Sequence, residues 1–395
     1  MKRPVWRLAF LASVPAAFLA ASAAPTPLYP IYQTEWSLSV EATSLVFGVY
    51  ALSLLCGLVV FARLSDHLGR RPVMWAALAI QIVALALFVA AADVDWLLCA
   101  RVLQGLSTGV GLSAVGAALL DTDVRRGTVA NAAAPPFGSA AGAMGAALLA
   151  QFGPAPTRLV YLVLIGVLVA QAIGLLFVPD GSARRPGVWA SLRPRVGAPR
   201  NVRLLLVAAC PVLFSVWAVS GLFGGLGPKL TAELSGSSSP ILGALPIAIV
   251  GAVSPIVAFA TSRLPGRVSL ACGIAGLVVG GLVVVAAVVS GIVGLLLGAA
   301  AIAGVAFGLG FRGGMQLVLP AVGQSERAGT LSLLYVASYL GFGLPVIVAG
   351  VVTARTGDLL GTTLGYVAVL LLLAVASALA LGLSRRAALE PEESE

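Results

Sequence analysis

Long apolar runs, separated by short polar segments, follow one another along almost the whole chain. A helix needs about 20 apolar residues to cross about 30 Å of hydrocarbon, so each run is a candidate membrane crossing. The charge-free stretch 268–311 is too long for one crossing, and Ser290-Gly291 is the best turn at which to divide it. The pattern therefore predicts twelve transmembrane helices: Leu8–Tyr32, Ala42–Ala62, Val73–Ala92, Leu97–Leu120, Thr128–Phe152, Leu159–Val178, Leu204–Gly227, Ile241–Ala260, Val268–Val289, Ile292–Phe311, Ala328–Thr353 and Leu359–Leu383.

The polar segment 179–203 divides these crossings into two groups of six. It holds four prolines and six arginines, which is typical of a solvated connector beside anionic lipid headgroups. We therefore expect an N-terminal bundle over residues 1–178, a cytoplasmic linker over 179–203 and a C-terminal bundle over 204–384. The last segment, 385–395, is acidic and is expected to be disordered.

The composition supports a multi-pass membrane protein and excludes several other classes. Hydrophobic residues make up 59% of the chain and charged residues only 10%, whereas soluble domains carry about 25% charged residues. The net charge of +9 does not indicate nucleic-acid binding, because the basic residues lie mostly between apolar runs. The four cysteines have no metal-ligand spacing. The strong bias toward arginine over lysine, with 46 glycines, points to a GC-rich bacterial genome.

The distribution of basic residues predicts that both termini lie in the cytoplasm. With that orientation, all but four of the 24 basic residues fall on the inner side, as the positive-inside rule requires. Arg158, Lys229 and Arg355 fall on the outer side, and Arg101 lies within a span. We expect the protein in the cell membrane. The first span also resembles a signal peptide with a cleavage site at Ala21-Ser22-Ala23, and its removal would leave eleven spans.

The most informative polar segment joins the second and third spans. It reads Ala62-Arg63-Leu64-Ser65-Asp66-His67-Leu68-Gly69-Arg70-Arg71-Pro72. A turn this tight needs a residue free to adopt a positive φ, which Gly69 supplies. Asp66, Arg70 and Arg71 place opposite charges at neighbouring helix ends, where they can hold one arrangement of the helices and release another. The alternative interpretation is a positively charged anchor with an ordinary turn.

This loop resembles the signature loop of the major facilitator superfamily in its leucine, aspartate, glycine and paired arginines. Ala62 replaces the family's leading glycine, and His67 stands where arginine is usual. The family also has twelve spans, a basic central linker and a cytoplasmic N-terminus, so the resemblance covers the whole chain. It implies an all-α integral membrane fold of two pseudo-symmetric six-helix bundles.

The resemblance also assigns a role to the loop. In the family, the loop stabilises the outward-facing state by bonding to charges at neighbouring helix ends. Asp121, at the inner end of the fourth span, matches the usual acidic partner. We therefore expect the cluster of Asp66 and Arg70 to break when the protein opens inward.

The fourth span contains Arg101-Val102-Leu103-Gln104-Gly105. An arginine within the apolar layer costs about 2.5–3.5 kcal/mol on insertion scales, so it usually faces a partner or a wet cavity. The alternative is that its side chain extends to the outer surface. The segment resembles the fourth-span motif of proton-coupled antiporters of the same superfamily. The resemblance implies that Arg101, with Gln104 and Gly105, transmits proton binding to the substrate cavity.

The first span ends in a segment too rich in proline for regular helical hydrogen bonding, residues 25–32. The helix must bend or unwind there, and it must border water or protein. The segment resembles the proline motif of drug–proton antiporters. Aromatic residues of this segment and of the second half are candidates to line the cavity, although interfacial anchoring, packing or lipid contact are alternatives. The cavity candidates are Pro27, Tyr29, Tyr32, Phe137, Trp217, Tyr335 and Tyr339.

Acidic residues are absent from the middle of every predicted span. A proton-coupled transporter needs a group that titrates in its pathway, usually a buried carboxylate. Glu41, at the start of the second span, is the best candidate, with Glu35 behind it, and either is placed to pair with Arg101. The alternative is that both are solvated loop acids. An aromatic cavity without buried acids favours a neutral or anionic apolar substrate.

These features predict a secondary transporter that works by alternating access and exports a small amphipathic or drug-like compound in exchange for protons. The alternative is an uptake permease or facilitator, a symporter or uniporter for a small metabolite. Ala143, which replaces the defining proline of antiporters in the fifth span, and the lack of a mid-membrane acid favour this alternative. No nucleophile motif, metal cluster or phosphate loop supports an enzyme, so no cofactor is expected. We expect a monomer that interacts with a small-molecule substrate, protons and membrane lipids, and not with nucleic acid.

Overall fold

The computed structural model describes residues 5–61, 63–179, 186–194, 196–324 and 326–389, and the regular structure of these residues is entirely helical. Ala62, residues 180–185 and 195 of the linker, and the acidic end 390–395 lie outside the described residues. The first half and the linker contain α1 (Val5–Ala23), η1 (Thr26–Leu28), α2 (Tyr29–Glu35), α3 (Val40–Val60), α4 (Leu64–Leu68), α5 (Arg70–Ala90), α6 (Val94–Thr122), α7 (Val124–Phe152), α8 (Leu159–Leu175) and α9 (Val188–Ser191). The second half contains η2 (Arg200–Val202), α10 (Arg203–Gly221), η3 (Leu222–Leu226), α11 (Gly227–Ser235), α12 (Pro240–Ala260), α13 (Gly266–Ser290), α14 (Val293–Val318), η4 (Leu319–Ala321), α15 (Arg327–Thr356) and α16 (Leu359–Leu389).

The twelve predicted crossings are found as helices. Ten segments are long and apolar enough to span a membrane, and the other two crossings are α8, an apolar helix of 17 residues, and α7, a helix of 29 residues rich in alanine and glycine. The division at Ser290-Gly291 is confirmed, because α13 ends at Ser290 and Gly291 follows with a φ of 70°. The last helix differs from the prediction: α16 continues to Leu389, so residues 385–389 are helical. Their alanines and leucine are good helix formers.

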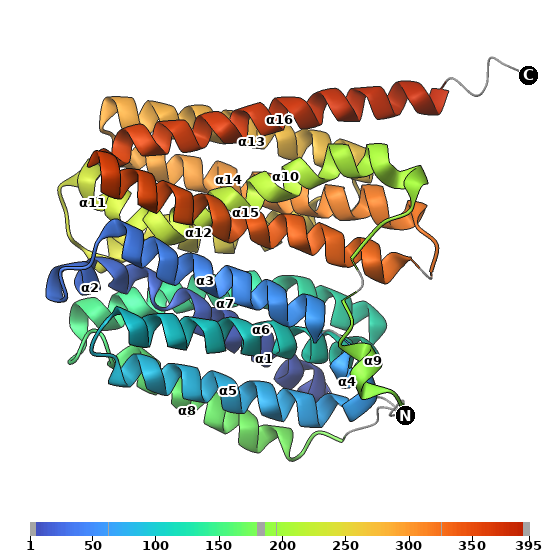
Figure 1. Ribbon diagram of the computed structural model, residues 1–395, viewed down its shortest axis with the longest axis horizontal. Coiled ribbons are helices and arrows are strands. Elements are labelled where there is room, and N and C mark those ends of the chain that lie inside the picture. Colours follow the sequence, from blue (N-terminus) through green and yellow to red (C-terminus); the bar gives the residue numbers. More distant parts are fainter. Residues whose placement is uncertain (1–4, 62, 180–185, 195, 325, 390–395) are drawn as a thin grey trace, which may run out of the picture.

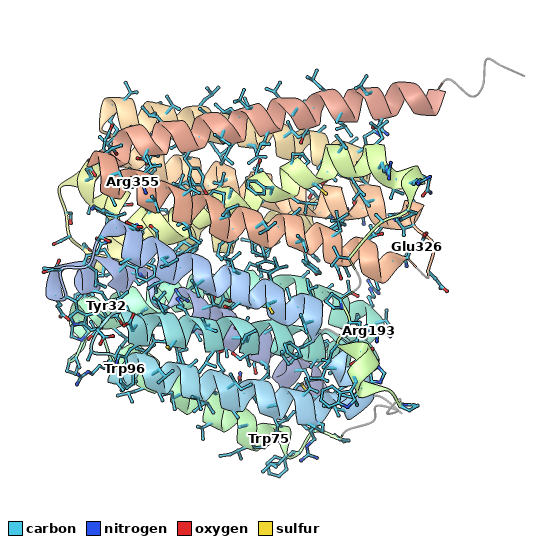
Figure 2. The ribbon with its side chains drawn as sticks, viewed as in Figure 1. Tyr32, Trp75, Trp96, Arg193, Glu326 and Arg355 are labelled. Atoms are coloured by element: carbon cyan, nitrogen blue, oxygen red, sulfur yellow. The ribbon has the colours of Figure 1, made fainter. Side chains whose placement is uncertain are left out.

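Two groups of nearly parallel helices lie against each other in Figure 1, α1–α8 in one and α10–α16 in the other. They meet mainly along α3 with α15 and along α7 with α12. We call the end of the bundle that contains α4 and α9 the linker end, and the opposite end, which contains α2 and α11, the far end. Tyr32 and Arg355 mark the far end in Figure 2, and Arg193 and Glu326 mark the linker end.

The first helix of each half is interrupted at a corresponding place. α1 and α10 both have 19 residues. A 3₁₀ turn, η1, separates α1 from α2, and a π-helical turn, η3, separates α10 from α11. Leu28-Tyr29-Pro30 in one half is matched by Leu226-Gly227-Pro228 in the other. The predicted break in the first span is therefore confirmed, and its repetition is typical of transporters built from internal repeats.

The two halves are packed tightly at the far end. A methyl group added to Gly350 of α15 would overlap the side chain of Ser44 of α3. Phe47 of α3 lies against the glycines of η3. Ser239 at the start of α12 donates a hydrogen bond of 2.9 Å to the side-chain oxygen of Gln151 of α7. These contacts seal the far end in this conformation.

Candidate functional site

The break in the first helix leaves backbone carbonyls without their usual partners. Pro25 has no N–H, so the carbonyl of Ala21 cannot accept the helical bond from four residues ahead. Gln104 of α6 donates its side-chain N–H to that oxygen at 3.0 Å. Arg101, one turn earlier on α6, donates to the carbonyl of Ser22 at 2.8 Å. The fourth span thus supplies the hydrogen bonds that the interrupted first span lacks.

Arg101 is completely buried, and its guanidinium joins the two sides of the break. In addition to the bond to Ser22 at the end of α1, the guanidinium donates a hydrogen bond of 2.5 Å to the hydroxyl of Tyr29, the first residue of α2. It donates another, of 2.7 Å, to the side-chain oxygen of Gln104. The last carbonyls of a helix carry a partial negative charge of about half an electron, which favours a cation there. Arg101 therefore clamps the bent first helix and is stabilised by the end of α1.

Three aromatic rings surround the same guanidinium. The guanidinium carbon lies 5.1 Å from the ring centre of Tyr50, 5.8 Å from that of Phe88 and 5.9 Å from that of Tyr29. A cation within about 6 Å of an aromatic face is attracted by the ring, the more so where water is excluded. Together with the carbonyl of Ser22, these rings stabilise a positive charge that the sequence places within the membrane.

No carboxylate among the described residues contacts Arg101, contrary to the prediction that Glu41 or Glu35 pairs with it. Both glutamates are exposed at the far end, Glu35 as the last residue of α2 and Glu41 in the first turn of α3. Only two ion pairs are found among the described residues, and both involve Arg70 at the linker end. Pro25 signals in the sequence that the end of α1 has a carbonyl without its helical donor, but it does not indicate which side chain supplies the bond.

Further polar contacts extend this buried site through the first half. Ser107, on the next turn of α6, donates to the side-chain oxygen of Gln81 of α5. The hydroxyls of Tyr32 and Tyr161 lie 3.1 Å apart, and the ring of Tyr161 stacks on Phe88 with centroids 4.7 Å apart. The contact of Tyr32 with Tyr161 connects α2 to α8, and the stacking of Tyr161 on Phe88 continues to α5. The bond of Ser107 to Gln81 joins α6 to α5.

We expect Tyr29→Phe to destabilise the protein more than Tyr32→Phe. Both side chains are buried, and both substitutions remove one hydroxyl. Tyr29 accepts from a charged donor, a bond worth about 1.5–3 kcal/mol, whereas the neutral bond of Tyr32 to Tyr161 is worth about 1 kcal/mol. Thermal unfolding of the purified variants measures the difference. Equal losses would contradict the role of Tyr29 as a partner of Arg101.

The signature loop forms a second polar site at the linker end. α4 occupies the loop, and Gly69 between α4 and α5 has a φ of 100°, which confirms the predicted need for glycine. Arg70 donates hydrogen bonds of 2.5 Å to the carboxylate of Asp66 and 2.7 Å to the hydroxyl of Ser65. A third hydrogen bond, of 3.3 Å, reaches Asp121 at the end of α6. The expected grouping of Asp66, Arg70 and Asp121 is therefore present.

The expectation that this cluster breaks on inward opening stays a prediction. The described members of the cluster lie on α4, α5 and α6, all in the first half, and they are bonded in this conformation. Two neighbours extend the cluster. Arg71 donates 3.0 Å to the carbonyl of Leu176 at the end of α8, and the Nδ1 atom of His67 lies 3.1 Å from the carbonyl of Pro186 in the linker. The cluster fixes the linker end of the first half.

We expect Asp66→Asn to reduce transport while changing the free energy of unfolding by no more than about 1 kcal/mol. The carboxylate is 35% exposed, and ion pairs in that setting contribute about 0–1 kcal/mol. Its charge, however, balances Arg70 where the first half meets the linker. Transport in vesicles and thermal unfolding are measured on the same preparation. Full transport by Asp66→Asn would show that the pair is only a surface contact.

An aromatic cluster lies between the two halves. Trp217 of α10 is its centre, with ring centroids 4.7 Å from Tyr339 and 5.5 Å from Phe342, both on α15. Phe307 and Phe311 of α14 also contact the indole, with centroids at 5.2 and 6.1 Å. Tyr335 lies next to Tyr339 at 6.3 Å. We call these six residues the aromatic cluster; it unites the three cavity candidates predicted in the second half.

The aromatic cluster touches the first half through Tyr50. Tyr50 and Leu54 of α3 form one buried apolar group with Tyr339, and Trp217 packs against that group. The ring of Tyr50 is also the ring nearest to the guanidinium of Arg101. Tyr50, which the sequence analysis did not single out, thus connects Arg101 to the other half. Its position on α3 gives no sequence signal, because aromatic residues are common in membrane helices.

The remaining cavity candidates lie apart from the aromatic cluster. Pro27, Tyr29 and Tyr32 are buried near the far end, within the first half. Phe137 of α7 is 66% exposed. Gly105 allows α6 to approach α3 closely, because an added methyl carbon would lie 2.5 Å from the carbonyl oxygen of Tyr50. These residues belong to the helix contacts around Arg101, except for Phe137.

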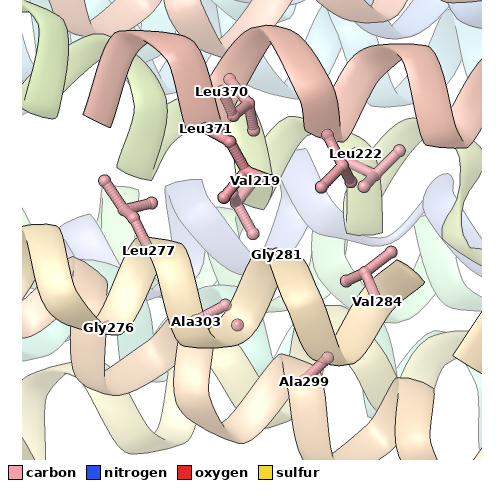
Figure 3. A pocket seen from close by; sticks show the side chains of 12 residues that line it. Val219, Leu222, Gly276, Leu277, Gly281, Val284, Ala299, Ala303, Leu370 and Leu371 are labelled. Carbon is pink, nitrogen blue, oxygen red and sulfur yellow. The ribbon is translucent and has the colours of Figure 1, made fainter. Parts of the chain in front are cut away.

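A small apolar pocket lies inside the second half (Figure 3). Residues of α10, η3, α13, α14 and α16 line it, among them Val219, Leu222, Gly281 and Leu370. Every lining residue is apolar, so the cavity offers no hydrogen bond or charge to a polar substrate. Its lining includes neither Arg101 nor any member of the aromatic cluster, and we assign it no part in the site.

Twelve membrane-crossing helices in two halves, a clamped break in the first helix and an aromatic cluster between the halves define a multi-pass membrane transporter. The model of the Major Facilitator Superfamily matches residues 9–341, and the chain belongs to this family. The resemblance seen in the signature loop is therefore confirmed. Proteins of this family are transporters and not enzymes.

Comparison with solved structures confirms the fold. A bacterial homologue of the human lysosomal transporter Spinster, in an inward-facing and unoccupied conformation, superimposes with a TM-score of 0.76 over 95% of this chain and 96% of that chain, at 17% identity. The same homologue in an inward-facing and occupied conformation gives a TM-score of 0.74 over 96% and 97% of the chains, at 16% identity. A search of curated proteins gave no significant match.

Proposed function

We propose that the protein is a proton-coupled secondary transporter that exports a small amphipathic compound by alternating access. In this proposal the linker end, which carries most of the basic residues, faces the cytoplasm. The conformation sealed at the far end is then the one that receives its substrate from inside the cell. The chain is expected to act as a monomer in the cell membrane.

The observation that supports coupling is the position of Arg101. It clamps the break of the first helix through Ser22 and Tyr29, and it contacts the ring of Tyr50, which packs against the aromatic cluster of the other half. A buried cation that touches both a hinge and the interface between halves responds to a change in either. We propose that substrate in the aromatic cluster and protons from the far side act on the same clamp.

Glu35 and Glu41 remain the proposed proton acceptors. They are exposed at the far end, beside the short helix α2 that Arg101 holds through Tyr29. In the mechanism we propose, the far end opens, protons bind there, and the release of Tyr29 by Arg101 lets α2 move. In this proposal, protonation removes the negative charges beside α2 and so changes the electrostatic environment of the break that Arg101 clamps.

Everted membrane vesicles with an acidic interior test this function. Their cytoplasmic face is outside, so an exported compound added to the medium enters the vesicle in exchange for a proton and makes the interior less acidic. We expect a pH-sensitive dye to report this change for at least one compound in a panel of small amphipathic molecules, and only in vesicles that contain the protein. A panel that never releases protons beyond the level of empty vesicles would contradict the proposal.

A second candidate is an uptake permease or facilitator for a small metabolite. The observation that favours it is the exposure of Glu35 and Glu41 and the lack of a carboxylate beside Arg101 among the described residues. A facilitator exchanges labelled for unlabelled compound across the membrane at the same rate with or without a pH gradient. An antiporter accumulates the compound only when the vesicle interior is acidic, and a proton symporter only when the medium is the more acidic side, so vesicles with the pH gradient imposed in either direction separate the classes.

A further inference from the structure

The aromatic cluster offers ring surface that its own members do not cover completely. Trp217, Phe307, Phe311, Tyr335 and Phe342 are each only partly buried, although their rings contact one another. All lie on α10, α14 or α15 of the second half, and Tyr50 of the first half borders them. Aromatic rings prefer tilted or offset ring partners at centroid distances of about 4.5–7 Å. A planar aromatic molecule is therefore the occupant that matches this surface.

The indole of Trp217 also has an unused hydrogen-bond donor. Its Nε1 atom is buried and has no hydrogen-bond partner among the described residues. A buried donor without an acceptor carries a desolvation cost, and such groups in native proteins call for a specific explanation. An acceptor on a molecule that enters between the rings removes that cost. The donor lies at the centre of the aromatic cluster, where it selects molecules by their acceptor.

The charge around the aromatic cluster disfavours cations. The acidic residues that the structure describes all lie at the ends of helices or in the short segments between them, for example Asp66, Asp121 and Glu326 at the linker end. The buried charge nearest to the cluster is Arg101, separated from Trp217 by Tyr50 and Tyr339. Ring faces by themselves attract cations, but at low dielectric the full charge of a guanidinium that has no carboxylate partner repels a second cation and attracts an anion.

We propose that the aromatic cluster binds a planar aromatic molecule that carries a hydrogen-bond acceptor and no positive charge, with the acceptor bonded to Nε1 of Trp217. This inference rests on the proposed transport function and names its substrate class. Neutral amides and aromatic carboxylates fit the class, and aromatic ammonium compounds do not. Trp217 is then the residue that determines specificity for the acceptor, and Arg101 is the charge that excludes cations.

Four naphthalene derivatives test the proposal on the purified full-length protein. 2-Naphthoate carries an anionic acceptor, 2-naphthamide a neutral acceptor, 2-naphthylmethylammonium a cation, and 2-ethylnaphthalene no acceptor. Binding is measured by the shift of the unfolding temperature with concentration, because a ligand of the folded state stabilises it by mass action. We expect the naphthoate and the naphthamide to bind at least tenfold more tightly than the ammonium compound.

Two tryptophan variants isolate the hydrogen bond. Trp217→Phe keeps an aromatic ring and removes the N–H, so we expect it to weaken 2-naphthamide at least fivefold and to leave 2-ethylnaphthalene unchanged. The unchanged apolar probe also shows that the variant is folded. Trp96→Phe, at the far end of the other half (Figure 2), is the matched control and keeps wild-type affinity for every probe.

Three outcomes would overturn the substrate class: equal binding of the ammonium and carboxylate probes, unchanged naphthamide affinity in Trp217→Phe, or no binding of the naphthoate and naphthamide up to their solubility limits. Each leaves the vesicle experiment intact, because proton release by some other compound would still support export. Conversely, Trp217-dependent binding without proton release in vesicles would support the substrate class and contradict proton-coupled export. The two proposals therefore fail separately.

Discussion

We expect Arg101→Met to reduce transport about 100-fold and to lower the free energy of unfolding by about 3 kcal/mol. The loss of transport follows because a coupling free energy of 1–3 kcal/mol corresponds to factors of about 5–150. The loss of stability is the net of two opposed terms. The substitution leaves the buried acceptors of Ser22, Gln104 and Tyr29 without their donor, at about 1–3 kcal/mol each, but it also removes the cost of burying a guanidinium.

The charge alone does not restore the function in this prediction. Arg101→Lys keeps the cation but lacks the planar fork that reaches Ser22 and Tyr29 at once, so we expect it to stay below a tenth of wild-type transport. Gln171→Met is the control, because Gln171 of α8 is also buried in the same half but donates its side-chain N–H to Ser13 of α1, away from the break. Proton release in everted vesicles and thermal unfolding are measured for all three variants. If Arg101→Met transports at the wild-type rate, then Arg101 has no role in coupling.

The helices and their breaks were largely predictable because they depend on local sequence. Apolar length determines the crossings, proline determines the break at η1, and Ser290-Gly291 ends α13 where the charge-free stretch had to be divided. The positive φ of Gly69 was likewise predictable, because a tight turn between two helices needs a glycine there. The end of α16 was wrong by a few residues, because Arg385–Leu389 favour helix as well as a polar tail.

The partners of Arg101 were not predictable in the same way. Side chains of opposite charge were the partners expected for Arg101. The observed acceptors include the carbonyl of Ser22, which lies at the end of α1, and the hydroxyl of Tyr29. These groups come from a segment more than seventy residues away in the sequence, and their direction depends on how α1 packs on α6. The absence of N–H at Pro25 was visible, but which side chain reaches the freed carbonyls was not.

The aromatic cluster of the second half was also only partly predictable. Trp217, Tyr335 and Tyr339 were each predicted from the sequence as cavity candidates, and the one-turn spacing of the two tyrosines placed them on one helix face. That Trp217 of α10 lies against that face, and that Tyr50 of α3 borders it, depends on contacts between distant helices. Tyr50 was therefore missed, although it joins the two candidate sites.

The approach of α3 to α6 keeps Tyr50 on Arg101, and Gly105 makes this approach possible. We expect Gly105→Ala to lower the free energy of unfolding by about 3 kcal/mol, the upper end for overpacking. The new methyl carbon would lie 2.5 Å from the carbonyl oxygen of Tyr50 and 2.8 Å from the backbone nitrogen of Leu54. Because both are backbone atoms, no side chain can turn away, and the helices must separate by roughly 1 Å to restore contacts of about 3.5 Å.

Gly145→Ala is the matched control for this substitution. Gly145 also lies within a long helix, α7, but an added methyl carbon there meets nothing within 4 Å. Alanine favours a helix over glycine by about 1 kcal/mol, so we expect Gly145→Ala to unfold at the same or a higher temperature than the wild type. Thermal unfolding of the two purified variants in one detergent gives the comparison. If Gly105→Ala is as stable as Gly145→Ala, then α3 and α6 do not approach each other as closely as the contact between Tyr50 and Arg101 requires.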